Sequence, residues 1–153
     1  MTNRLYLDEE QQALVTAAFN FLKPQLLLGG RAKDLTNIND DIILKSSLSV
    51  CFGTLEAFYR SSKIKLEQDK EADCFIALAY FLLKDLDKAH LEFSIHNKML
   101  AAFLSGTEKT FSKTFYEHRC DGYERTVNWL KTGDQKYTTG LARVLLSMEK
   151  EAT

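Results

Sequence analysis

The chain has 153 residues, of which 45% are hydrophobic and 27% are charged, as in ordinary soluble proteins. A chain of this length can bury enough surface to fold without a disulfide or a metal. The 20 basic and 21 acidic side chains leave a formal net charge of −1, whereas nucleic-acid binders typically carry a basic surplus. We therefore expect a single domain over residues 1–153 and no nucleic-acid partner.

The three cysteines, Cys51, Cys74 and Cys120, have neither CxxC spacing nor the Cys/His spacing of a zinc site. Their odd number, with no secretory leader behind Met1, favours a reducing compartment. The longest apolar run, from Cys74 to Leu83, is about half of the ~20 residues needed to cross a bilayer. We therefore expect a cytoplasmic protein without a membrane segment, a metal or a cofactor.

Helix is the favoured secondary structure, because leucine far outnumbers the β-branched valine and isoleucine, and Pro24 is the only proline. Apolar residues also recur with helical spacing. We predict an all-α fold of about six helices in an irregular antiparallel bundle. The expected helices cover about 9–28, a segment beginning near 39 and including Phe58, 67–84, 87–104, 108–131 and 134–150.

The first expected helix has Asp8 as its N-cap and the pair Gly29 and Gly30 as its stop signal. Pro24 inside it predicts a kink or an early end. The second follows a polar loop at 31–37 and carries its apolar residues on one side, at Leu44, Leu48, Cys51, Leu55 and Phe58.

The third and fourth expected helices are separated only by a short break at 84–86, which predicts a tight central αα-hairpin. Ile76–Tyr80, Asp85–Ala89 and Phe93 place small and aromatic residues around this turn. This pattern resembles one tetratricopeptide helix pair, although Lys84 replaces the usual glycine and His96 an expected small residue. The pattern does not recur one repeat length further along the chain.

The fifth expected helix is dense in aromatic residues, and Gly133 ends it. Tyr116, Tyr123 and Trp129 do not all fit on the face that carries the helix's phenylalanines. Exposed aromatic area often marks a contact site. We therefore take these three residues as candidate binding residues for a protein partner, or for self-association as a homodimer through the last two helices.

The histidines form no recognisable catalytic or metal site. His90 and His96 lie about 120° from alignment on a regular helix, and the Glu-x-x-His motif of di-iron bundles is absent. His118 shares a face with Phe115, as a packing residue would, and lies about 200° around the helix from Cys120. Phosphate-binding glycine loops and serine-nucleophile motifs are also absent. We expect no catalytic residue, while an enzyme without a known motif stays open.

Two functional hypotheses follow. The first is a non-enzymatic interaction or regulatory protein, such as an adaptor, a chaperone-like factor or an inhibitor, that holds a protein partner in a helical groove or on an aromatic face. The alternative is a small-molecule sensor whose bundle core encloses an apolar ligand, with His118 or His96 as its polar anchor.

Overall fold

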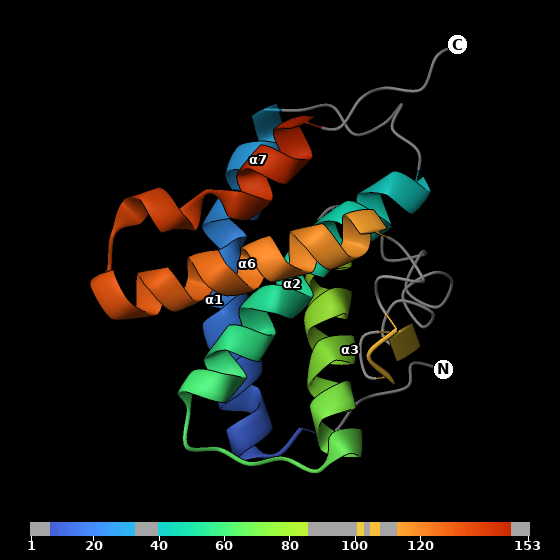
Figure 1. Cartoon of the computed structure of the whole chain (residues 1–153), viewed down its shortest axis with the longest axis vertical. Helices are drawn as coiled ribbons and strands as arrows, with labels where there is room; N and C mark the ends of the chain where they lie inside the picture. The colour runs from blue at the N-terminus through green and yellow to red at the C-terminus, as the bar shows by residue number, and fades with distance from the viewer. Residues whose placement is uncertain (1–6, 33–39, 86–100, 103–104, 108–112, 148–153) are drawn as a thin grey trace.

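The computed structural model describes residues 7–32, 40–85, 101–102, 105–107 and 113–147, and this part of the chain is all-α, without strands. Its elements are α1 (Glu9–Ala32), α2 (Asp40–Ser61), α3 (Gln68–Asp85), α6 (Lys113–Thr132), the 3-10 helix η2 (Gln135–Thr138) and α7 (Gly140–Ser147) (Figure 1). The predicted fold class is confirmed. The expected helix at 87–104, the second half of the predicted hairpin, lies outside the described residues except for its end at 101–102.

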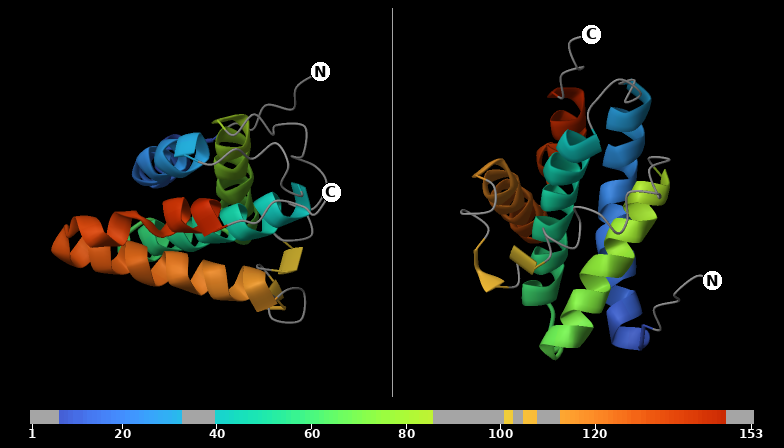
Figure 2. Two further views of the ribbon diagram at one scale, coloured as in Figure 1. Left: turned by 90° about the horizontal axis from the view of Figure 1, so that it is seen from above. Right: turned by 90° about the vertical axis from the view of Figure 1, so that its right-hand side faces the viewer.

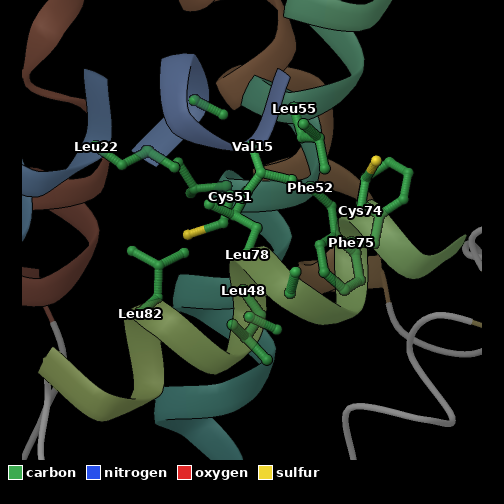
Figure 3. Packing of buried hydrophobic residues seen from close by; sticks show 14 of the residues in the cluster. Val15, Leu22, Leu48, Cys51, Phe52, Leu55, Cys74, Phe75, Leu78 and Leu82 are labelled. Atoms are coloured by element: carbon green, nitrogen blue, oxygen red, sulfur yellow. The ribbon is translucent and has the colours of Figure 1, made fainter. Parts of the chain in front are cut away.

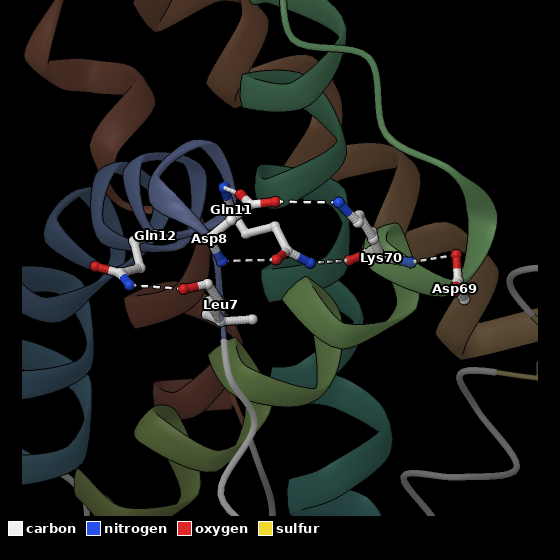
Figure 4. A network of polar contacts seen from close by, with 6 residues as sticks. All are labelled: Leu7, Asp8, Gln11, Gln12, Asp69 and Lys70. Atoms are coloured by element: carbon white, nitrogen blue, oxygen red, sulfur yellow. Dashed lines mark hydrogen bonds and ion pairs between the residues drawn. The ribbon is translucent and has the colours of Figure 1, made fainter.

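Two reciprocal hydrogen bonds start α1. The backbone N–H of Gln11 donates to Asp8 Oδ1 and the N–H of Asp8 donates to Gln11 Oε1, both over 2.9 Å. This is a capping box, and it confirms the predicted cap at Asp8. Gln11 Nε2 also donates to the carbonyl oxygen of Lys70 on α3, whose Nζ lies 3.3 Å from Asp8 Oδ2 (Figure 4). The same residues therefore begin α1 and join it to the start of α3.

α1 continues past both of its predicted interruptions. It runs to Ala32, so the stop predicted at Gly29 and Gly30 was wrong. Pro24 lies inside the helix and, having no N–H, leaves the carbonyl of Asn20 without its usual helical hydrogen bond. α1 packs against α2, α3 and α7. Packing of this kind supplies most of the stability of a helix in a protein, and it outweighs the local signals here.

α2 occupies the centre of the fold, between α6 on one side and α1 with α3 on the other (Figure 2). The ring centroid of Phe52 on α2 lies 5.1 Å from that of Phe75 on α3 and 6.1 Å from that of Phe115 on α6. Around these rings, the core contains further buried side chains from α1, α2 and α3 (Figure 3), namely Val15, Leu22, Leu48, Cys51, Leu55, Leu78 and Leu82. The predicted apolar side of the second helix is therefore confirmed at Leu48, Cys51 and Leu55.

α2 and α6 cross at a very short distance, because each has a glycine at the crossing. A Cβ atom built on Gly53 would overlap the carbonyl oxygen of Arg119. A Cβ atom on Gly122 would lie 2.6 Å from the carbonyl oxygen of Val50. These atoms belong to the backbones of the facing helices, so neither position can hold a side chain at this separation.

The C-terminal helix predicted at 134–150 is divided in two. Asp134 caps η2 by accepting a hydrogen bond from the N–H of Lys136, and α7 begins separately at Gly140. Gly133 has a φ of 69° and ends α6 as predicted. Among the described residues, no helix combines the length and the apolar character that crossing a membrane requires.

Candidate functional site

A groove of about 510 Å³ lies between α1, η2 and the C-terminal parts of α2 and α6. The C-terminal ends of α2 and α6 and the 3-10 helix η2 are on the left-hand side of Figure 1. Ten described residues line it, namely Ala17, Asn20, Phe21, Pro24, Gln25, Phe58, Trp129, Gln135, Thr138 and Thr139. Its volume is in the range of known ligand sites. Asn20, Pro24 and Gln135 are exposed, so the groove is open to solvent along this edge.

Three aromatic rings from three helices form the apolar part of the groove. The centroid of Trp129 on α6 lies 4.8 Å from that of Phe21 on α1 and 6.4 Å from that of Phe58 on α2. The two phenylalanine rings meet edge to face at 6.0 Å. All three side chains are half-buried, so they support one another while part of their surface stays available to an occupant.

The polar part of the groove contains only amides and hydroxyls. None of the ten lining residues is ionisable, although 27% of the whole chain is charged. The hydroxyls of Thr138 and Thr139 donate to the carbonyl oxygens of Gln135 and Lys136, over 2.7 and 3.3 Å. Their oxygens retain lone pairs that can accept a hydrogen bond from an occupant.

Gln25 is a fixed part of the wall, with 4% of its surface exposed. Its Nε2 donates to the carbonyl oxygen of Phe21 over 3.1 Å, and its Oε1 accepts the N–H of Leu141 at the start of α7 over 3.0 Å. Both ends of the amide are therefore engaged, so Gln25 holds its position without an occupant.

The three predicted partner-binding residues do not share one surface. Trp129 lines the groove, whereas Tyr116 lies 13 residues earlier, about 20 Å along the same helix axis. The guanidinium carbon of Arg119 lies 5.7 Å from the centre of the Tyr116 ring. Tyr123 is half-buried, and its backbone nitrogen lies at the close crossing of α6 with Gly53. Only Trp129 therefore contributes to the groove.

His118, one of the two predicted ligand anchors, is not among the described residues that line the groove. His118 is half-buried on α6, and burial lowers the pKa of its imidazole, against the opposing effect of Asp121 and Glu117. It precedes Trp129 by 11 residues, about 16 Å along the helix. His96 lies outside the described residues. Within the described part of the chain, no three His, Cys, Asp or Glu side chains gather where they could hold a metal ion.

The two buried cysteines have no nucleophilic character. Burial raises the pKa of the Cys74 thiol to about 12, aided by Asp73, and burial also raises the pKa of the Cys51 thiol. Both groups therefore stay protonated at neutral pH, and a thiol reacts mainly as its thiolate.

Sequence analysis did not identify most of the groove. The apolar spacing of the second helix predicted Phe58 on its core side, and no sequence pattern pointed to Phe21, Gln25, Gln135 or Thr138 as groove residues. One signal was present in the sequence, because Phe21 follows Leu14 by seven residues and therefore lies about 20° from it on a regular helix, at the edge of the stripe formed by Leu14, Ala18 and Leu22. An aromatic residue beside a core stripe indicates a further contact.

Comparison of the chain with models of protein families, with curated proteins and with solved structures gave no match. The resemblance of residues 76–93 to a tetratricopeptide helix pair therefore has no support from a family model. What the groove binds is inferred below from its own geometry and chemistry.

Proposed function

We propose that this protein is a protein-binding module that holds an apolar, uncharged segment of a partner in the groove between α1, α2, α6 and η2. The observation that carries the proposal is the three-ring cluster of Phe21, Phe58 and Trp129 in an open groove whose ten described lining residues include no ionisable side chain. Aromatic residues are enriched at the centres of protein interfaces, where charged residues are depleted.

The chemistry of the groove supports binding rather than catalysis. General acid–base catalysis requires a group that can exchange a proton near the operating pH. The amides, hydroxyls and aromatic rings that line the groove include no such group. An adaptor, a chaperone-like factor and an inhibitor all need only a binding surface, and the partner would decide among these roles.

The open shape of the groove favours a partner chain over an enclosed small molecule. Small-molecule sites usually bury about 70–90% of their ligand's surface. Here the exposed residues Asn20, Pro24 and Gln135 leave one side open, so an occupant would keep part of its surface in solvent. The sensor hypothesis also stays a proposal; of its two anchors, His118 is not a described lining residue of the groove, and His96 lies outside the described residues.

A cytoplasmic location also stays a proposal. The free thiols of Cys51, Cys74 and Cys120 support it, since unpaired cysteines are typical of a reducing compartment.

Selection from a displayed library of random 12-residue peptides tests the proposed function. Peptides retained by the full chain are counter-screened on Gln135→Glu, which places a carboxylate at the groove. The matched control is Gln68→Glu, because Gln68 is also the exposed first residue of a helix, α3, and does not line the groove. We expect selected peptides to bind Gln135→Glu at least tenfold more weakly than both the wild type and the control.

Two results would contradict the proposal. Either no peptide is enriched, or the enriched peptides bind wild type and Gln135→Glu alike. Native mass spectrometry of the purified protein addresses the alternative, since an adduct of small-molecule mass that is lost on Gln135→Glu would favour the sensor hypothesis.

A further inference from the structure

We infer that the occupant of the groove is an extended, uncharged and proline-containing peptide segment. This inference rests on the proposed function and specifies the chemistry of the partner. Three features of the groove carry it: the absence of charge, the hydrogen-bonding groups at its edge, and the arrangement of its aromatic rings.

The absence of charge excludes ionised side chains from the bound segment. A charged group that enters the groove loses water, and none of the ten lining residues offers an opposite charge to compensate. A basic or an acidic motif would therefore be rejected. The residues that face the groove must be apolar or neutral.

The hydrogen-bonding groups of the edge favour an occupant with free backbone carbonyls. The Trp129 indole N–H and the side-chain amides of Asn20 and Gln135 make no hydrogen bond with any other residue that the structure describes. The indole can only donate, while the two amides can both donate and accept. A helical partner satisfies its own backbone internally and would cover these groups without pairing them, which is unfavourable. An extended segment presents free carbonyls to them.

The aromatic rings favour proline within that segment. Phe21, Phe58 and Trp129 are tilted against one another by 50–69°, so they form a ridged surface rather than a flat stack. Polyproline II segments have no internal hydrogen bonds, and they dock into aromatic-lined grooves at a low entropic cost because they are already extended. Trp129 supplies both a ring face and an N–H donor to such a segment.

Binding of a capped decaproline peptide to the full chain tests this inference. Trp129 is the only tryptophan in the chain, so its emission reports directly on the groove. We expect decaproline to shift this emission to shorter wavelength in a saturable titration. A capped peptide of alternating proline and glutamate should give at most one tenth of this affinity, and so should a neutral helical peptide of alanine and glutamine.

Alanine variants then locate the binding site by isothermal titration calorimetry. Asn20→Ala and Gln135→Ala should each weaken decaproline binding at least threefold, and together at least tenfold. Gln68→Ala, which removes an exposed amide outside the groove, should leave the affinity unchanged. Both groove positions are exposed, so the variants should fold as the wild type does, and circular dichroism checks this.

Several outcomes would overturn the inference. It fails if decaproline gives no saturable shift, if the glutamate-containing or helical peptide binds as well, or if the alanine variants bind like the wild type. If decaproline fails while the displayed peptides bind through Gln135, only the inference is lost. If no peptide of any kind depends on Gln135, the proposed function is lost with it. A concentration-dependent dimer that Gln135→Glu dissociates would show that a second copy occupies the groove.

Discussion

The hydroxyl oxygens of Thr54 on α2 and Thr126 on α6 lie 2.9 Å apart, in a pair that is buried where these helices cross. Thr126 Oγ1 also donates to the carbonyl oxygen of Gly122 over 2.7 Å. A hydroxyl has a single hydrogen to donate. Thr54 must therefore be the donor of the pair and Thr126 the acceptor.

Replacing either threonine by the isosteric valine should destabilise the protein unequally. Thr126→Val removes the acceptor of Thr54 and the donor to Gly122, so we expect a loss of about 2 kcal/mol. Thr54→Val removes only one hydrogen bond and should cost about 1 kcal/mol. Because the pair is coupled, the double variant should lose less than the sum. Urea unfolding of the three variants measures this, and additive losses would disprove the coupling.

Alanine at either crossing glycine should be strongly destabilising. Glycine to alanine inside a helix ordinarily stabilises by up to about 1 kcal/mol. Here the added Cβ would meet the backbone of the facing helix, so we expect Gly53→Ala and Gly122→Ala each to lose about 3 kcal/mol or more. Gly140→Ala is the control, because its Cβ would meet side chains and no backbone, with Arg125 Cδ at 2.9 Å and Asp121 Oδ2 at 4.0 Å. Chemical denaturation should show a much smaller loss of unfolding free energy for Gly140→Ala than for the other two variants.

The ion pair between Arg119 and Glu56 should contribute more stability than an exposed pair. Their charged atoms lie 2.9 Å apart, and the side chains are only 14% and 13% exposed. Arg119→Ala leaves the Glu56 carboxylate with one remaining cation, Arg60, at 3.4 Å. We therefore expect the free energy of unfolding to fall by about 2 kcal/mol, which is less than the loss when a buried charge keeps no partner. Lys113→Ala, from a largely exposed pair, should cost under about 0.5 kcal/mol in the same unfolding assay. Equal effects would contradict the expectation.

His118 should make the protein less stable as the pH falls. Burial lowers the pKa of this imidazole in the folded state, so below the ordinary pKa of about 6.5 the unfolded chain binds a proton more readily. Stability is therefore lost as the pH falls through 6.5 toward the folded pKa. His118→Gln has no imidazole to protonate, so its stability relative to that of the wild type should increase as the pH is lowered from 7.5 to 5.5. A difference in urea midpoint that stays constant with pH would contradict this.

Alkylation should distinguish the three cysteines. Cys120 is half-buried, with Arg119 Nη2 at 3.7 Å from its sulfur, whereas Cys51 and Cys74 are buried and have raised thiol pKa values. We expect iodoacetamide at pH 8 to modify only Cys120 among these residues in the folded protein, and all three in urea. Peptide mass spectrometry identifies the modified sites, and early modification of Cys51 would show that the core opens.

Local signals predicted the helix ends that depend on neighbouring residues. The cap at Asp8 and the end of α6 before Gly133 each follow from a few residues. Gly29 and Gly30 carry the same type of signal but lie within α1, because packing of this helix against three others outweighs it.

Features that depend on distant residues could not be predicted in this way. Gly53 and Gly122 are weak helix formers in the sequence, and only the crossing of α2 with α6 gives them a role. Aromatic density drew attention to Trp129, but its neighbours Phe21 and Phe58 come from helices far away in the chain. The groove exists only where these elements meet, so no single segment carries its signature.

Gln25 links the groove to α7. The Gln25 side chain that lines the groove also accepts the N–H of Leu141, the second residue of α7. An occupant that breaks the hydrogen bond between Gln25 and Leu141 would destabilise the start of α7, and one that strengthens this bond would stabilise it. An occupant that acts on Gln25 in this way would couple binding in the groove to the docking of α7, and by reciprocity a partner that displaces α7 would then alter affinity at the groove by the same factor.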